Sequence, residues 1–188
     1  GDANYEVFVA GSSVATGTLN DGNSYTASVT PGSLSQKTVR IESDAPILVH
    51  HHNNYSSNYY DAVALHPATD ESVYGIGSKS MLVASGENLT SIDYIFYDET
   101  TATTQSIAAN GNFRKSSSSG QGYDGAIKVT PDNSVGVSQI ADGDGGEETM
   151  FWPSSAMGTK FGSAQDVQYI TVAAPTIGTT CTVYDNTG

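Results

Sequence analysis

The sequence predicts an all-β protein made of two tandem antiparallel β-sandwich units, of the Ig-like or jelly-roll-like kind. Its apolar runs are short, rich in β-branched and aromatic residues, and about as long as typical strands. Clusters of Gly, Pro, Asn, Asp and Ser separate these runs at spacings typical of sandwiches. Charged residues make up only 14% of the chain, and no window has convincing helical periodicity.

The predicted strands follow one another along the whole chain. In the first half they are 5–11, 24–32, 37–44, 45–52, 61–67 and 80–86. In the second half they are 91–98, 125–132, 134–140, 148–153, 168–175 and 180–185. Turn sequences such as "NDGN", "TPGS", "ANGN" and "DGDGG" stand between them. The best candidate for a helical turn is the short stretch 153–157, which begins with a proline.

Several strand sequences recur at a nearly constant distance. "EVFVAG" from Glu6 resembles "YIFYDE" from Tyr94, and "MLVAS" from Met81 resembles "YITVA" from Tyr169, each 88 positions on. "ALHP" and "MFWP" are 86 positions apart, and "VTPGS" and "VTPDN" are 100 apart. We interpret these matches as an internal duplication with its boundary near 86–91, which gives one unit at 1–90 and a second at 91–188.

The last predicted strand, within "TTCTVYDNTG" at 179–188, is a third occurrence of the strand that starts each unit. It either closes the second sandwich or pairs with a neighbouring molecule in a head-to-tail array, because an open sheet edge accepts further strands. The candidate assembly residues are Cys181, Val183 and Tyr184.

The composition excludes several classes of partner. The net charge is −13, which disfavours binding to nucleic acid or to an anionic membrane. No run of about 20 apolar residues could span a bilayer. Cys181 is the only cysteine, so the fold holds no internal disulfide. An acidic, lysine-poor surface is compatible with extracellular surroundings.

Three motifs of the first half resemble a known family. They are "TLNDGNS" at 18–24, "IESDAPI" at 41–47 and an Asp-led apolar strand from Asp61 to Pro67. The pattern resembles the repeated β-sandwich domain found at the N-terminus of the IgG Fc-binding protein and in many bacterial surface proteins. The resemblance implies an extracellular, non-enzymatic module used in tandem for adhesion or surface construction. Within the motif, the Asp44 carboxylate is expected to cap or close its turn, and Pro46 fixes the backbone where the next strand begins.

The stretch "VHHHNNYSSNYYD" is the most conspicuous polar and aromatic segment. We interpret it as a surface loop, and its tyrosines could stack on a glycan or on a host-surface receptor. A metal site using His50 and His52 with Asp61 or His66 is an alternative, although the spacing matches no established zinc motif. The candidate recognition residues are His52, Asn53, Asn54, Tyr55, Tyr59 and Tyr60.

Acidic residues cluster in "ADGDGGEETM", and they are Asp142, Asp144, Glu147 and Glu148. Carboxylates on a flexible turn are ligands that Ca²⁺ prefers, but the spacing of an EF-hand loop is missing. Calcium is therefore the one candidate cofactor, and a solvated acidic loop is the alternative.

Neither a Gly-x-Ser-x-Gly elbow nor a phosphate-binding loop is present in the sequence, and no catalytic residues are predicted. Trp152 is expected to lie in the core, whereas an exposed Trp152 would suggest sugar binding.

The sequence thus predicts a non-enzymatic building block of a surface filament, a cell-surface layer, or a virion fibre or decoration. Its expected partners are other copies or neighbouring subunits. The alternative is a glycan- or calcium-binding module.

Overall fold

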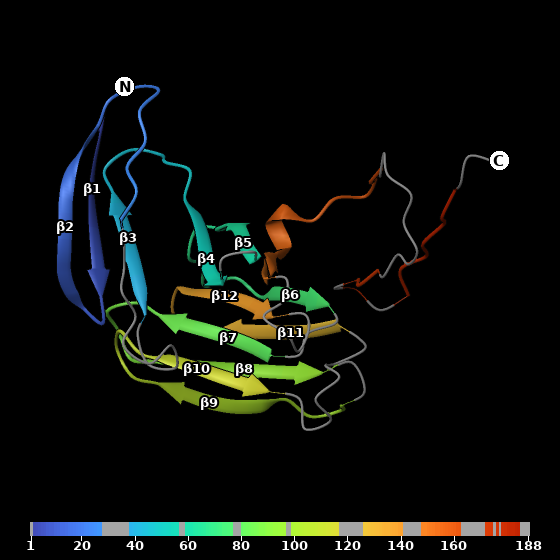
Figure 1. Ribbon diagram of the computed structural model, residues 1–188. Coiled ribbons are helices and arrows are strands. Elements are labelled where there is room, and N and C mark those ends of the chain that lie inside the picture. Colours follow the sequence, from blue (N-terminus) through green and yellow to red (C-terminus); the bar gives the residue numbers. More distant parts are fainter. Residues whose placement is uncertain are drawn as a thin grey trace.

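A computed structural model describes residues 2–27, 38–56, 59–76, 80–96, 99–116, 126–140, 148–162, 172–174, 176 and 178–184. The described residues form four antiparallel sheets and one short 3-10 turn, η1 (Ser154–Ala156), as Figure 1 shows. The predicted all-β, antiparallel fold is therefore confirmed, and η1 lies within the predicted helical turn at 153–157.

The N-terminal sheet has three strands, β1 (Ala3–Val9), β2 (Ser12–Leu19) and β3 (Val39–Ser43), in the order β2-β1-β3. A hairpin follows, made of β4 (His50–Ser56) and β5 (Tyr59–Ala64). Ala3 and Val7 of β1 are buried on one face of the sheet.

Two larger sheets lie beside the N-terminal sheet (Figure 1). The four-stranded sheet has the order β10-β7-β12-β13, and the five-stranded sheet has the order β14-β6-β11-β8-β9. Their bounds are β6 (Val73–Ile76), β7 (Ser80–Ser85), β8 (Thr90–Phe96), β9 (Thr103–Ile107), β10 (Asn112–Ser116), β11 (Ala126–Pro131), β12 (Val135–Ile140), β13 (Glu148–Met150) and β14 (Trp152–Pro153).

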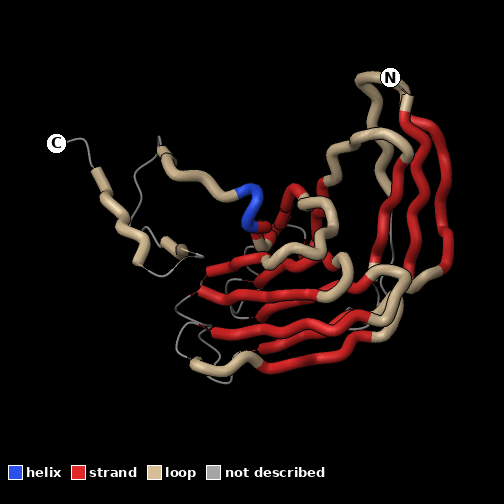
Figure 2. Tube along the Cα trace, turned by 180° about the vertical axis from the view of Figure 1, so that it is seen from behind, coloured by secondary structure: helices blue, strands red, loops and turns tan. Residues whose placement is uncertain are grey.

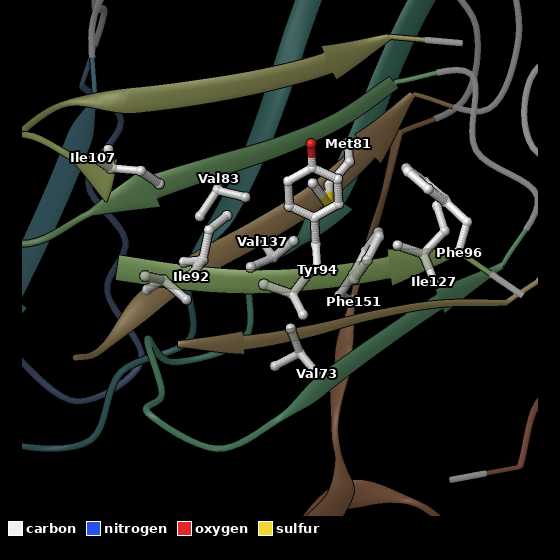
Figure 3. Packing of buried hydrophobic residues seen from close by; sticks show 12 residues of the cluster. Val73, Met81, Val83, Ile92, Tyr94, Phe96, Ile107, Ile127, Val137 and Phe151 are labelled. Atoms are coloured by element: carbon white, nitrogen blue, oxygen red, sulfur yellow. The ribbon is translucent and has the colours of Figure 1, made fainter. Parts of the chain in front are cut away.

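One hydrophobic core holds these two sheets together, and we call the unit from β6 to β14 the sandwich. Its alternate apolar residues point inward from both sheets, as period-two strands require. Figure 3 shows Met81, Val83 and Val137 of one sheet facing Ile92 and Ile127 of the other. Phe151 lies in the same cluster and is almost fully buried.

Phe151 packs against a glycine of β6. A Cβ atom at Gly75 would lie 2.3 Å from Cε1 of the Phe151 ring, so only a residue without a side chain fits there. Gly75 thus provides the space that a core aromatic ring occupies.

Polar contacts join the N-terminal sheet to the sandwich. Thr38 donates its hydroxyl proton to the Gly111 carbonyl at 2.7 Å, and its own carbonyl accepts the Ala10 N–H at 2.9 Å. Nη2 of Arg40 lies 2.7 Å from Glu87 Oε1, and its guanidinium stacks on the Phe8 ring at 4.0 Å.

The strand pairs of the N-terminal sheet recur inside the sandwich with the same register. In the β1–β2 pair Tyr5 lies opposite Gly17, and in the β8–β9 pair Ile92 lies opposite Gln105. Ile92 is 87 positions after Tyr5, and Gln105 is 88 positions after Gly17. In the β1–β3 pair Tyr5 lies opposite Ser43, and in the β8–β11 pair Ile92 lies opposite Pro131. Thus β1, β2 and β3 correspond to β8, β9 and β11.

The hydrogen bonds at the ends of these strands correspond as well. Asn4 donates its backbone N–H to Asp44 Oδ1 at 2.7 Å, and Ser91 donates its own to Asp132 Oδ1 at 2.8 Å. In return the Asp44 N–H bonds the Asn4 carbonyl, and the Asp132 N–H bonds the Ser91 carbonyl. The expected turn-closing role of Asp44 is confirmed.

The hairpins and tight turns follow the same correspondence. The Leu65 N–H bonds the Val49 carbonyl at 2.9 Å, and the Phe151 N–H bonds the Val137 carbonyl at 2.9 Å. The Asn23 N–H bonds the Asn20 carbonyl, as the Gly111 N–H bonds the Ala108 carbonyl. The third residue of each turn has positive φ: it is Gly22 (79°) in the first and Asn110 (55°) in the second.

The predicted boundary near 86–91 falls between β7 and β8, whose Met81, Val83 and Ile92 share one core, and the division into two units stays a prediction. The match of "VTPGS" to "VTPDN" is wrong in register, because 129–131 pair with β8 as 41–43 pair with β1.

Candidate functional site

Two strands of the sandwich, β6 and β7, have no counterpart among β1–β5. In the sandwich β6 pairs with the outer edge of β11, and β7 lies between β10 and β12. The corresponding places in the N-terminal half are the outer edge of β3 and the gap between segments 24–27 and 47–49. Within the described residues, no strand pairs with β3 on that edge, and neither segment is part of a strand. We call the edge of β3 with these two segments the open slot.

Apolar side chains at the open slot are exposed where their counterparts are buried. Val39 is 45% exposed and Ile41 is 36% exposed. Their counterparts in β11, Ile127 and Val129, are both 0% exposed. The difference arises because β6 and β7 cover β11 in the sandwich, whereas the described residues place no such strands over β3. The slot is therefore a sheet edge with exposed apolar side chains on one face, and such an edge can accept strands.

The opposite face of the N-terminal sheet is polar. A shallow depression on this side is lined by acidic and hydroxyl side chains that include Glu6, Thr16, Glu42 and Asp44. The side-chain and backbone hydrogen bonds from Asn4 hold the pKa of the Asp44 carboxyl below its ordinary value. The Asp44 carboxylate therefore holds its turn against Asn4 of β1.

Trp152 does not lie in the core, so the expectation of a buried Trp152 is wrong. Its side chain is 54% exposed, and the ring of His66 packs edge-on against it at 4.7 Å. Phe151 fills the core instead, because adjacent residues of a strand point to opposite faces.

Trp152 begins a line of side chains across the outward face of the five-stranded sheet. It lies opposite Tyr74, Tyr74 lies opposite Lys128, and Lys128 lies opposite Ile95. We call these four residues the tryptophan row. Next to it runs a polar line, in which the Ser72 and Thr130 hydroxyls are 3.0 Å apart and Thr104 donates to Asp93 at 2.6 Å.

A carboxylate anchors the chain beyond the tryptophan row. Glu71 Oε2 accepts the Ser155 N–H at 3.1 Å and the Ser154 hydroxyl at 3.2 Å. These hydrogen bonds lower the pKa of Glu71, and the bond from the Ser155 backbone has the largest effect. Sequence reasoning missed this contact, because Glu71 and Ser155 are 84 positions apart and neither belongs to a motif.

The candidate recognition residues belong to the β4–β5 hairpin. The backbone pairs His52 with Ala62, Asn53 with Asp61 and Asn54 with Tyr60. The side chains of 52–62, which include Tyr55, Tyr59 and the Asp61 of the alternative metal site, lie outside the described residues, so recognition by this hairpin stays a prediction.

The candidate calcium ligands fall largely outside the described residues. Asp142, Asp144 and Glu147 belong to the undescribed part, and Glu148 begins β13 with its side chain undescribed. Elsewhere, the described residues contain no group of three or more His, Cys, Asp or Glu that could hold a metal ion.

The candidate assembly residues Cys181, Val183 and Tyr184 are exposed. In the described stretch 178–184 no strand is assigned, so this segment neither closes the sandwich nor pairs with another described segment. Figures 1 and 2 show the described C-terminal residues on the side of the molecule opposite the N-terminal sheet.

Comparison with protein families, with curated proteins and with solved structures found no match to this chain. The resemblance to the IgG Fc-binding type of domain therefore stays a prediction. In the described part of the chain, no helix has the length and apolar character needed to cross a membrane.

Proposed function

We propose that this chain is a non-enzymatic, extracellular building block of a surface filament, a cell-surface layer, or a virion fibre or decoration. It is made by internal duplication of one β-sandwich unit, with the sequence repeats beginning at β1 and at β8. Its mechanism is assembly through sheet edges, which needs no titrating group and no cofactor.

The open slot is the observation that carries this proposal. An antiparallel edge with exposed Val39 and Ile41 is a surface that proteins usually cover, charge or shorten, because it recruits other strands. Among the described residues Val39 and Ile41 stay exposed, whereas in the sandwich two further strands cover the corresponding residues. The low charge content and the resemblance to tandem surface domains support the same function.

The proposal is tested by the state of the full chain at rising concentration. We expect sedimentation velocity to detect growing species, and negative-stain electron microscopy to show fibres or ordered sheets with a regular repeat. A chain that remains monomeric at all concentrations would contradict the proposed function.

The tryptophan row favours a second candidate function, the binding of a neutral, unbranched glycan. An exposed indole offers a flat apolar face for a sugar ring, and the neighbouring hydroxyls and carboxylate offer partners for sugar hydroxyls. The strongly negative net charge disfavours sulfated or sialylated chains.

Trp152 is the only tryptophan, so its fluorescence reports on this surface directly. We expect cello-, malto-, manno- or chito-oligosaccharide to protect it from acrylamide quenching in dilute monomer. By calorimetry, Trp152→Ala should abolish that binding, whereas Tyr184→Ala, which removes another exposed ring, should not. Quenching that none of these sugars changes would contradict the second candidate.

A further inference from the structure

We propose that the open slot is filled by residues 157–174 of a second copy of this chain, which supply the counterparts of β6 and β7 that the described residues do not place there. We call these residues the donor segment. The inference rests on the proposed function and adds to it the identity of the partner, the segment that inserts and its register.

The sequence of the donor segment repeats that of β6 and β7. Phe161-Gly162 follows Tyr74-Gly75 by 87 positions. At the same displacement Tyr169-Ile170 follows Leu82-Val83, which shifts by one residue the match of "MLVAS" to "YITVA" described above. The displacement equals that of Asn4 to Ser91, which the corresponding hydrogen bonds to Asp44 and Asp132 align. The chain therefore carries two copies of the β6–β7 sequence but only one place, within its own described sheets, where such a pair is inserted.

The described part of the donor segment is available for pairing. No strand is assigned to residues 157–162 or 172–174, and Phe161 is 85% exposed. Nothing lies within 4 Å of the position that a Cβ atom would take at Gly162. By contrast, its counterpart Gly75 lies under the ring of Phe151.

The register of the sandwich predicts how the donor segment lies on β3. Gly75 pairs with Ile127 and Tyr74 pairs with Lys128. In the complex, Gly162 of one copy therefore lies opposite Val39 of the other, and Phe161 lies opposite Arg40. Leu65, which corresponds to Phe151, then lies over Gly162, as Phe151 lies over Gly75.

The register of the sandwich also assigns a place to the second half of the donor segment, of which 163–171 lie outside the described residues. In the sandwich Val83 pairs with Phe113 on one side and Val137 on the other. The corresponding residues are Ile170 of the donor, with Tyr25 and Val49 of the acceptor. Tyr25 and Val49 belong to segments that are not strands in the single chain, and the donor would give the backbone of each a strand to pair with.

A second copy is favoured over folding back within one chain. In the sandwich, β6 and β7 come directly after the β4–β5 hairpin of the preceding repeat, so each repeat donates its last two strands forward. The donor segment likewise comes directly after β13 and β14. Its described residues lie apart from all three strands of the N-terminal sheet (Figures 1 and 2). Residues 179–184 repeat β1 and are not needed in the slot.

One substitution on each side tests the contact in the full chain. Gly162→Asp on the donor and Val39→Asp on the acceptor each place a carboxylate in an interface that should be apolar. We expect each to weaken self-association by about tenfold or more, measured by sedimentation velocity. Thr176→Asp, just beyond the donor segment, and Val14→Asp, an exposed position of β2, are the matched controls and should assemble as the wild type does.

All four positions are exposed in the single chain, so the melting temperature of dilute protein should not change. A synthetic peptide of residues 157–174 supplies an independent measurement. We expect a fluorescently labelled peptide to bind wild-type protein and not Val39→Asp, and unlabelled peptide to dissolve the assemblies. A scrambled peptide should do neither.

The outcomes separate this inference from the proposed function. Assembly that persists in both Gly162→Asp and Val39→Asp would overturn the donor assignment and leave a different assembly contact. A wild-type chain that never assembles would contradict the proposed function; specific binding of the peptide would then still support the donor assignment, and its failure to bind would overturn it.

Discussion

At the residue scale, the repeated turn depends on an aspartate whose carboxylate accepts a backbone N–H from the neighbouring strand. Asp44 and Asp132 do this at corresponding places, to Asn4 and Ser91. The role of Asp44 could be predicted because turn chemistry is local. The exposure of Trp152 could not, because Phe151 and Trp152 are both aromatic and a one-residue shift in strand phase exchanges their faces.

Because hydrogen bonds from Asn4 lower the pKa of Asp44, we expect the N-terminal sheet to lose stability in acid. Its stabilising contribution is present above the pKa of the unfolded chain and is lost as the pH falls through the lower, folded pKa. Wild type should therefore be more stable than Asp44→Asn at neutral pH, and the difference should vanish in acid. Urea unfolding at a series of pH values measures this. A difference that is constant with pH would contradict it, and Asp70→Asn is the exposed control.

Gly75 is the residue on which the sandwich core should depend most sharply. Gly75→Ala places a Cβ atom against the Phe151 ring and should cost roughly 1–3 kcal/mol in free energy of unfolding, as overpacking does. Gly136→Ala, in β12, meets no atom within 4 Å and should change stability by less than about 1 kcal/mol. Urea denaturation compares the two, and equal effects would contradict the packing described for Phe151.

At the element scale, the apolar strands were predicted and several polar ones were missed. The sequence patterns indicated β1, β3, β7, β8, β11 and β12, whose alternating apolar residues face a core or the open slot. They did not indicate β2 and β9, which are rich in Ser and Thr. Both are edge strands that pair on one side only, so they need little apolar surface and give little signal.

The two halves should differ in local stability in dilute protein. The backbone amides of β7, β8, β11 and β12 belong to strands flanked on both sides around one core, so they should exchange hydrogen slowly. Amides of β3 should exchange faster, because one edge is open and Val39 and Ile41 are exposed. Hydrogen exchange by mass spectrometry measures both, and β3 should gain protection on assembly. Protection of β3 equal to that of β11 in the monomer would contradict the open slot.

At the scale of the whole molecule, similar strand sequences could be matched along the chain, but the sequence did not show which of these strands share a core. Strand similarity placed the start of each repeat at β1 and β8, whereas the core groups β6 and β7 with the strands that follow them. A linear repeat has no intrinsic starting point, and only the pairing of strands decides which residues close which unit. For the same reason, the expected assembly strand within 179–188 differs from the proposed donor segment, which is longer and lies before it at 157–174.

The charge of the whole molecule should control assembly. Each copy carries a net charge of −13, so copies repel one another, while the proposed contact itself is largely apolar. Because the screening length falls from about 30 Å at 0.01 M salt to about 3 Å at 1 M, assembly should strengthen as salt is added. Sedimentation velocity across this range measures it, and assemblies that dissolve in salt would indicate a contact made by ion pairs.

The most direct test is a disulfide between two copies. In a Cys181→Ser background, one protein carries Val39→Cys and a second carries Gly162→Cys, and the two are mixed under mild oxidation. Residues opposite each other on antiparallel strands have Cα atoms about 4.5–5.5 Å apart, which is within disulfide reach. Heterodimers should form rapidly in the mixture, and a Val14→Cys protein should not form them with the Gly162→Cys protein. Failure of the mixture to cross-link faster than that control pair would contradict the account.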